Sequence, residues 1–277
     1  MKKLSVVLLT LTNSKELYNM TLNCINTLME SENDITIEVI AIESNKDYLT
    51  SEYKYPDFVK VIVPDTSFNF HKYLNIGIKE STGDYIALCN NDLVFYKNWF
   101  TEIFKTAEMD SSVLSFSPAK DYKIQYDGFY ELGYKVRTHI MGWCIVVNKK
   151  MFDKIGLLDE TFDFYYADND YAMTLKSKNI KHAVVFNSKV QHLEKCSSET
   201  SPIVLEGHRS YPYLSKYKIP AYLHKKEYEW VLENEKSLSG FLKYHNKWGS
   251  PNFLYKKNKL ADIFIKYKLG YFVRFFL

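Results

Sequence analysis

The chain has 277 residues with 46% apolar and 25% charged side chains and a net charge of +3, which suits one or two globular domains and excludes wholesale disorder. Its four cysteines are more than fifty positions apart, which argues against a zinc ribbon and a disulfide framework, so we expect reduced thiols in a cytoplasmic setting. The apolar run near the N-terminus lacks a small-residue cleavage site, so we expect a first strand there and not a signal peptide.

The first ninety residues alternate between apolar, β-branched runs and amphipathic segments. Such runs predict buried strands, and apolar residues at helical spacing after cap-type residues predict helices. The expected elements are a strand at 4–11, a helix at about 17–28, strands at 37–42 and 59–63, a helix at 73–79 and a strand at 85–89. This order predicts an α/β fold with an open, mostly parallel sheet flanked by helices, in which ligands bind beyond the carboxyl ends of the strands.

The next hundred residues are less regular. The expected elements are a helix at 99–107, a strand at 111–117, a polar loop or hairpin at 118–139, a strand at 140–147, helices at 149–155 and 168–178, and a strand at 182–186 that leads toward His192.

The chain changes character beyond Pro202, where strand-like runs stop and helical segments rich in Tyr, Lys and Leu follow. Residues 205–277 contain 14 Lys and Arg against 6 Asp and Glu, whereas residues 1–204 contain 22 against 27. We therefore expect an α/β domain at 1–204 and a basic helical extension at 205–277. The positive excess favours an anionic partner, such as a membrane surface or a charged acceptor, or else marks an ordinary solvated surface.

The final segment, residues 257–277, has apolar residues at helical spacing with lysines beside them. A basic amphipathic helix of this kind can make a peripheral contact with an anionic membrane, where lipid-linked acceptors reside. The alternative, which the pattern slightly favours, is that the apolar stripe docks on the chain's own domain or on a second subunit of a homo-oligomer.

Asn90-Asn91-Asp92 directly follows a predicted strand. A carboxylate flanked by amides at this place can hold a hard divalent cation such as Mg²⁺ or Mn²⁺, which prefers oxygen ligands and bridges to phosphates. The alternative is an ordinary Asn/Asp turn.

Asp168 and Asp170 stand at the start of a predicted helix. Carboxylates two positions apart on a helix do not share a face, so one can point into a cleft while the other caps the helix. The alternative is an acidic first turn that interacts with the helix dipole. His192, which follows the last predicted strand, is by itself more often a packing residue than a ligand.

Several segments occur in an order that resembles a known enzyme family. They are the opening strand with Thr12-Asn13, residues 37–45 ending in Glu43-Ser44-Asn45, residues 68–78 followed by Thr82-Gly83-Asp84, Asn90-Asn91-Asp92, Gly142-Trp143, residues 152–162, residues 166–170 and Val190-Gln191-His192. Over roughly residues 4–193 the chain resembles the inverting, nucleotide-sugar-dependent glycosyltransferases of family 2, which have the Rossmann-like GT-A fold. Two positions depart from the pattern: Asn90 replaces the first Asp of the DXD motif, and Ala167 replaces a common Glu.

The resemblance implies transfer of a sugar from a UDP-, dTDP- or GDP-linked donor to a glycan, lipid-linked or protein acceptor, as in polysaccharide biosynthesis. It implies a Mn²⁺ or Mg²⁺ ion held by Asp92 and His192, and a catalytic base at Asp168, with Asp170 as the alternative. The nucleotide-sugar half is expected at about 1–95 and the acceptor half at about 96–204. The residues expected to bind the nucleotide sugar are Thr10, Thr12, Glu43, Asn75, Asn90, Asn91, Asp92, Gly142 and Trp143.

Other interpretations remain open at this point. Thr10 can simply end a strand, Glu43 can cap a turn, and Trp143 can fill the core. A nucleotidyltransferase is a second enzyme class, although residues 10–16 lack the glycines of a phosphate loop. A non-catalytic carbohydrate-binding scaffold with a decayed site is a third, for which Asn90 and Ala167 would be the signs.

Overall fold

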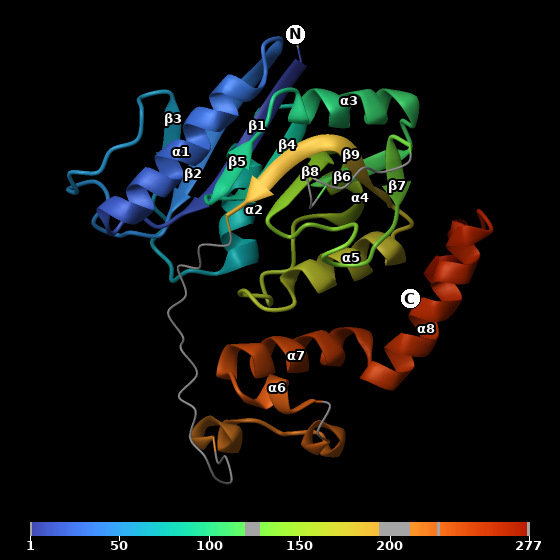
Figure 1. Cartoon of the computed structure of the whole chain (residues 1–277). Coiled ribbons are helices and arrows are strands. Elements are labelled where there is room, and N and C mark those ends of the chain that lie inside the picture. The colour runs from blue at the N-terminus through green and yellow to red at the C-terminus, as the bar shows by residue number, and fades with distance from the viewer. Residues whose placement is uncertain (1, 120–127, 194–210, 226–227, 276–277) are drawn as a thin grey trace.

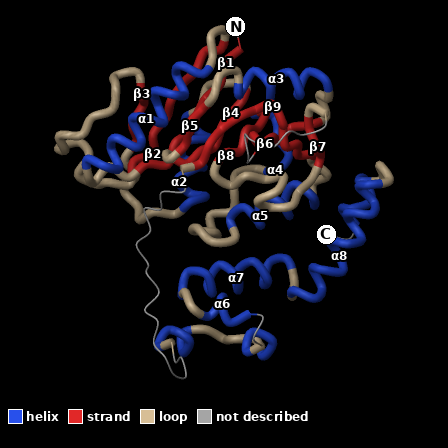
Figure 2. The backbone as a smooth tube through the Cα atoms, in the orientation of Figure 1, coloured by secondary structure: helices blue, strands red, loops and turns tan. Residues whose placement is uncertain are grey.

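The computed structural model describes residues 2–119, 128–193, 211–225 and 228–275. An α/β part holds all the strands of the described chain, and a helical part follows it (Figures 1 and 2). The strands are β1 Lys2–Thr10, β2 Ile35–Glu43, β3 Val59–Ile62, β4 Tyr85–Asn90, β5 Leu93–Phe95, β6 Val113–Ala119, β7 Tyr130–Leu132, β8 Cys144–Asn148 and β9 Lys181–His192. The helices are α1 Lys15–Ser31, α2 Phe70–Glu80, α3 Trp99–Met109, α4 Phe152–Ile155, α5 Ala167–Ser177, α6 Glu229–Leu232, α7 Glu235–Trp248 and α8 Pro251–Lys266, with 3₁₀ turns η1 Lys149–Met151, η2 Pro212–Lys216, η3 Ala221–His224 and η5 Gly270–Phe275.

The strands form one sheet in the order β3-β2-β1-β4-β8-β6-β9-β5, with β7 paired to β9. The expected α/β sheet is confirmed, and its parallel half is β3-β2-β1-β4. Beyond β4 the sheet is mixed, because β8 runs antiparallel to both β4 and β6, and β5 and β7 run antiparallel to β9. The described part of the segment between β6 and β8 contains no helix, whereas a crossover between parallel strands usually contains one.

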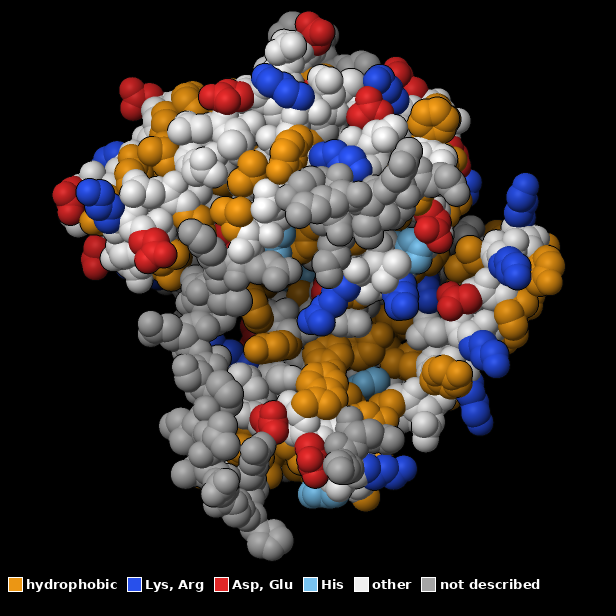
Figure 3. All heavy atoms as spheres, in the orientation of Figure 1, with side chains coloured by type: hydrophobic (Ala, Val, Ile, Leu, Met, Phe, Trp, Pro, Cys, Tyr) orange, Lys and Arg blue, Asp and Glu red, His pale blue; other side chains and the backbone are white. Residues whose placement is uncertain are grey.

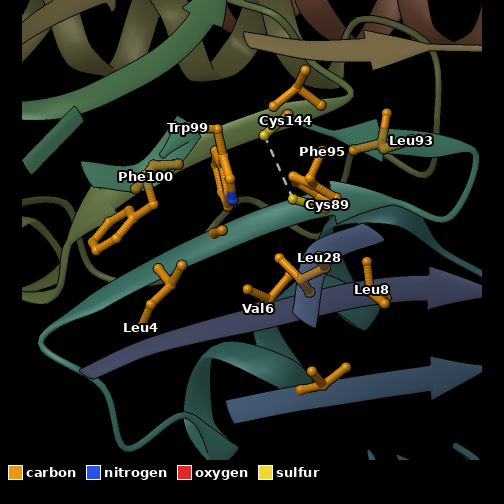
Figure 4. Packing of buried hydrophobic residues seen from close by; sticks show 14 of the residues in the cluster. Leu4, Val6, Leu8, Leu28, Cys89, Leu93, Phe95, Trp99, Phe100 and Cys144 are labelled. Atoms are coloured by element: carbon orange, nitrogen blue, oxygen red, sulfur yellow. Dashed lines mark hydrogen bonds between the residues drawn. The ribbon is translucent and has the colours of Figure 1, made fainter. Parts of the chain in front are cut away.

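Helices cover both faces of the sheet, which explains why the central strands are continuously apolar. Leu4, Val6 and Leu8 of β1 pack with α1 and α3 on one face (Figure 4). Val7 and Leu9 of the same strand pack with α2 and α5 on the other face. Alternate residues of one strand therefore enter two separate cores, as the pleat requires.

The core between the sheet and helices α2 and α5 leaves no space for a side chain at Gly77, where α2 crosses β1. A Cβ built on Gly77 would lie 2.8 Å from Val7 Cγ2 and closer still to Val7 Cγ1. We expect Gly77→Ala to lower the free energy of unfolding by about 1–3 kcal/mol through overpacking, even though alanine favours the helix. Lys79→Ala, an exposed site on the same helix, should change it by no more than about 0.5 kcal/mol. Urea unfolding measures both, and equal stability of the two variants would contradict the packing.

Some elements differ from the sequence expectations. β5 and β7 were not expected as separate strands, and each is only three residues long. The strand expected at 140–147 begins at Cys144, because residues 135–141 form a turn in which Arg137 N–H donates to the Ile140 carbonyl. The expected domain boundary at residues 204 and 205 lies outside the described residues, as does part of the expected loop at 118–139.

The C-terminal part is helical, as expected, and α7 lies beside α5 (Figure 1). Tyr244 of α7 packs in one apolar cluster with Phe162, Ala167 and Met173. The extension therefore shares a core with the α/β part. Within the described residues, no helix has the length and apolar character needed to cross a membrane.

Candidate active site

Thr10, Thr12 and Glu43 meet where β1 and β2 end, and all three side chains are buried. The Glu43 carboxylate accepts hydrogen bonds from the Thr10 hydroxyl (2.8 Å), from the Thr12 hydroxyl (2.7 Å) and backbone N–H (2.9 Å), and from the Tyr55 hydroxyl (3.1 Å). The side chains expected to face a nucleotide are hydrogen-bonded to one another in the structure, and their contact with a nucleotide stays a prediction. The network satisfies a buried carboxylate and fixes the strand ends that form this side of the site.

Asn75 and Asn91 are also occupied by internal contacts. The Asn75 amide donates to the Leu158 carbonyl (2.9 Å) and accepts from the Leu158 N–H (2.9 Å), which ties α2 to the loop before α5. The Asn91 amide donates to the Thr21 hydroxyl of α1 (2.7 Å). Both side chains therefore hold neighbouring segments in place, and their expected contact with the donor stays a prediction.

Asp92, His192 and Trp143 form a contiguous group at the ends of β4 and β9. The pairing of β5 with β9 places His192 opposite Leu93, so that its Nε2 lies 3.2 Å from Asp92 Oδ1. The His192 imidazole stacks on the Trp143 indole, with ring centroids 5.4 Å apart and planes 13° apart. The Asn90 N–H donates to the Trp143 carbonyl (2.9 Å), which joins β4 to this group.

The donor set at Asp92 and His192 limits what kind of cation could bind there. The described residues contain no group of three or more His, Cys, Asp and Glu side chains suited to hold a metal ion. Mg²⁺ and Mn²⁺ in phosphate chemistry commonly use one or two protein ligands together with water and substrate phosphates. Asp92 and His192 therefore do not make up a complete coordination shell. They fit an ion whose other ligands are water and the oxygens of a diphosphate.

Asp168 lies in the first turn of α5 against Gly142, the residue before Trp143. A Cβ on Gly142 would lie 3.3 Å from Asp168 Oδ2, so a small residue at this position lets the two segments approach closely. Burial raises the pKa of Asp168, although the Asn169 N–H and the positive charge of Arg137 oppose this. A partly buried carboxylate with a raised pKa is suited to accept a proton near neutral pH.

Asp170, two positions after Asp168, is held by the end of α7. Its Oδ1 accepts hydrogen bonds from the Trp248 indole N–H (2.7 Å) and from Lys247 Nζ (2.7 Å). Lys247 Nζ also lies 2.7 Å from Asp159 Oδ2. Lys247 and Trp248 were not among the residues predicted from the sequence. A Lys-Trp pair carries no local signal that its side chains contact aspartates about eighty residues earlier in the chain.

Lys247 contributes stability through this clamp on Asp170 and Asp159. Burial would raise the pKa of Asp159, but hydrogen bonds from Lys247 and Thr161 lower it to about 2. A lowered folded-state pKa means that this stability is present above about pH 4 and is lost as the pH falls toward 2. We expect Lys247→Met to destabilise the fold at pH 7 by about 2 kcal/mol, which is less than the cost of breaking a fully buried pair because Lys247 is partly exposed.

The control for Lys247→Met is Lys243→Met on the same helix. Lys243 pairs with Asp163, whose side chain is 45% exposed, so its loss should cost no more than about 0.5 kcal/mol. Urea unfolding at pH 7 and near pH 2 measures the effect. A deficit of Lys247→Met that stays constant down to pH 2 would contradict the clamp.

The contacts thus run without a break from one candidate carboxylate to the other. Asp168 abuts Gly142, Gly142 is bonded to Trp143, Trp143 stacks on His192, and His192 contacts Asp92. The strand ends with Thr10, Thr12 and Glu43 lie beside this arc, since Leu9 of β1 pairs with Asn90 of β4.

Comparisons with known proteins show the family to which the chain belongs. A family model named glycosyl transferase family 2 matches residues 5–175, which is more than half of the chain. The chain belongs to glycosyl transferase family 2. No curated protein sequence matches the chain.

Solved glycosyltransferases share the fold of this family member. It superposes on GalNAc-T7, crystallised with UDP, GalNAc and Mn²⁺, with a TM-score of 0.54 and 14% identity over 69% of this chain and 44% of that one. It superposes on S. aureus TarS with a TM-score of 0.50 and 15% identity over 69% of this chain and 36% of that one. The match therefore spans less than half of either neighbour, and at such identities it shows the GT-A-like fold alone.

Proposed function

We propose that this glycosyltransferase moves a sugar from a nucleotide diphosphate donor to an acceptor hydroxyl with inversion at the anomeric carbon. The observation that carries the proposal is the unbroken arc from Asp92 to Asp168 in a chain of this family. The arc provides one group suited to the leaving diphosphate and another suited to the attacking hydroxyl. Inverting transfer needs these two functions on opposite faces of the sugar ring.

Asp168 is the proposed catalytic base. Its carboxylate accepts the proton of the acceptor hydroxyl while the acceptor oxygen bonds to the anomeric carbon and the bond to the diphosphate oxygen breaks. Its raised pKa brings it nearer the pH at which the enzyme would work. Asp170, the sequence alternative, is a weaker candidate because Trp248 and Lys247 already occupy Oδ1 of its buried carboxylate.

Asp92 and His192 are the proposed protein ligands for Mn²⁺ or Mg²⁺ on the donor side. When bound, such an ion neutralises the charge that develops on the departing diphosphate. Asn90 and Trp143 are proposed to line the donor site beside them. Thr10, Thr12, Glu43, Asn75 and Asn91 are proposed to act indirectly, by holding the strand ends and the loop before α5 in place.

The acceptor is proposed to approach from the side of α5. A cavity of about 610 Å³ opens between residues 131–139, α5 and α8, and Asn169, the neighbour of Asp168, lies in its wall. Tyr134 and Tyr244 provide aromatic faces there, and Lys176 and Asp262 provide polar groups. Such a mixture of apolar and polar groups suits a glycan or a glycoconjugate. A role in polysaccharide biosynthesis and a cytoplasmic location remain predictions.

A thermal-shift screen tests the donor proposal. We expect one class among UDP-, GDP- and dTDP-sugars to raise the melting temperature, and Mn²⁺ to enlarge the shift, because a ligand that binds only the folded state stabilises it. Slow hydrolysis of the same donor would then demonstrate catalysis.

Two other outcomes would contradict it. Binding of glycans without binding or turnover of any donor would favour the scaffold with a decayed site, to which Asn90 and Ala167 point. Transfer of a nucleotidyl group would restore the nucleotidyltransferase alternative, which has no support in the family match.

A further inference from the structure

One face of α8 carries large apolar side chains that the described part of the chain leaves exposed. Phe253, Leu260, Ile263 and Tyr267 are 50%, 37%, 46% and 66% exposed. Their spacing of seven, three and four residues places them on one side of the helix. Lys256 falls within the same stripe.

The opposite side of α8 makes the contacts that hold the helix against the rest of the chain. Leu254 and Ala261 are buried, and Lys176 of α5 donates to Asn258 (2.8 Å) and pairs with Asp262 (3.2 Å). Docking on the chain's own domain, one of the sequence alternatives, therefore explains this side and leaves the stripe uncovered.

The surroundings of the stripe are positively charged. Residues 251–269 contain five lysines and one aspartate, and that aspartate already pairs with Lys176. Figure 3 shows apolar side chains and lysines side by side along α8, at the right-hand edge of the view. Lys257 Nζ lies 4.3 Å from the ring centre of Phe253, so cationic and aromatic groups are in direct contact.

We propose that the stripe of α8, with Leu269 just beyond it, docks on an anionic lipid bilayer. A basic helix with one apolar face lies in the plane of the interface, with its apolar side chains among the acyl chains and its lysines at the headgroups. Aromatic side chains favour this interfacial depth, and each lysine near an anionic surface adds to binding. The charge of the face selects anionic lipid over a neutral surface and disfavours a second copy, whose equivalent stripe would be equally positive.

The position of α8 would bring the active site close to that bilayer. α7 ends at Trp248, which bonds to Asp170 beside the proposed base, and α8 begins three residues later at Pro251. A lipid-linked acceptor would thus meet the site near the membrane. This consequence rests on the proposed function, whereas the docking surface does not.

Vesicle co-sedimentation of the full chain tests the inference. We expect binding to vesicles of phosphatidylcholine with about 30% phosphatidylglycerol, little binding to phosphatidylcholine alone, and weaker binding as salt is raised. No binding to the anionic vesicles at low salt would overturn the proposal. The assay requires no substrate, so its failure is distinct from a failure of donor binding or transfer.

Removing the apolar stripe provides the first variant, Phe253→Ser combined with Ile263→Ser and Tyr267→Ser. We expect it to bind anionic vesicles at least tenfold more weakly, with circular dichroism and the melting temperature showing a folded protein. The matched control replaces exposed apolar residues elsewhere, with Leu49→Ser and Met109→Ser. Equal binding by the two variants would overturn the proposal.

The second variant removes charge and leaves the buried side of α8 unchanged. It combines Lys256→Gln, Lys259→Gln and Lys266→Gln, all at exposed positions. Loss of three surface lysines should weaken binding by roughly 100-fold.

The matched charge control is Lys15→Gln with Lys79→Gln and Lys154→Gln, at exposed positions on other helices. It should bind as the unaltered chain does, and equal losses in both charge variants would show non-specific attraction and overturn the proposal.

Sedimentation velocity tests the remaining alternative, that a second copy of the chain binds the stripe. A dimer that dissociates when the three apolar residues are replaced, in a protein that ignores anionic vesicles, would assign the stripe to a second copy of the chain. We expect instead that the stripe variant leaves the oligomeric state unchanged.

Discussion

Asp168→Asn is expected to reduce the rate of sugar transfer by about 10²–10⁴-fold while leaving donor affinity within a fewfold of the unaltered enzyme. The asparagine has the same shape but cannot take the proton of the acceptor hydroxyl, and a positioned base supplies this much of the rate. The measurement pairs steady-state transfer with a titration of the donor in the presence of Mn²⁺. Asp153→Asn, an exposed site on α4, is the control and should transfer normally.

Asp168→Asn should also raise the stability of the folded protein at pH 7. Burial raises the pKa of Asp168, so the folded state loses stability as the pH rises through that value and the carboxyl ionises. Asparagine does not ionise, so Asp168→Asn should melt at a higher temperature than the unaltered chain at pH 7. Below the ordinary carboxyl pKa of about 4 the difference should vanish. Unchanged transfer by Asp168→Asn would show that another group is the base.

Asp92→Asn is expected to abolish the enhancement of donor binding by Mn²⁺ and to lower transfer by about 10²–10³-fold. Its carboxylate is the proposed anionic ligand beside His192, and loss of the charge that stabilises a leaving group typically has an effect of this size. The donor thermal shift, with and without Mn²⁺, measures the first part directly.

The control for Asp92→Asn lies at the opposite end of the same strand. Asp84 precedes β4 and Asp92 follows it, so Asp84→Asn carries the same chemical change at the edge of the sheet away from the site. It should retain the Mn²⁺ enhancement. If both variants retain it, the cation is bound elsewhere or is not used.

Much of the fold could be predicted because the central strands have a clear signal in the sequence, namely runs of apolar, β-branched residues. β1, β4 and the second half of β2 are buried on both faces, so their sequences there are almost continuously apolar, as strands of a covered sheet require. β5 and β7 were missed because three residues carry no measurable period. The antiparallel direction of β8 depends on a connection whose sequence is polar and irregular, and local patterns do not fix the direction of such a strand.

The nearness of some candidate residues could be predicted from their places at strand ends, whereas their roles stay predictions. Asp92 lies between β4 and β5, β5 pairs with β9, and so Asp92 meets His192 at the end of β9. Asp168 lies against Gly142. The direction of other polar side chains was not predictable. Glu43 and Asn75 have the same strand-end or helix context as a ligand-binding residue, yet internal donors and acceptors satisfy them, which only tertiary structure reveals.

Lys247 shows the complementary limit. A lysine on a basic helix is usually a solvated charge, and its pairing with Asp159 and Asp170 arises only when α7 packs beside α5. The extension that composition marked as separate therefore helps to fix the first turn of the helix that carries the proposed base.

Anomalous scattering from crystals grown with Mn²⁺ and the stabilising nucleotide sugar, using Asp168→Asn to prevent turnover, tests the central claim most directly. The account predicts one Mn²⁺ peak bonded to Asp92 and the diphosphate, near His192, with residue 168 on the opposite face of the sugar ring. A peak away from Asp92, or a sugar whose free face points away from residue 168, would contradict it.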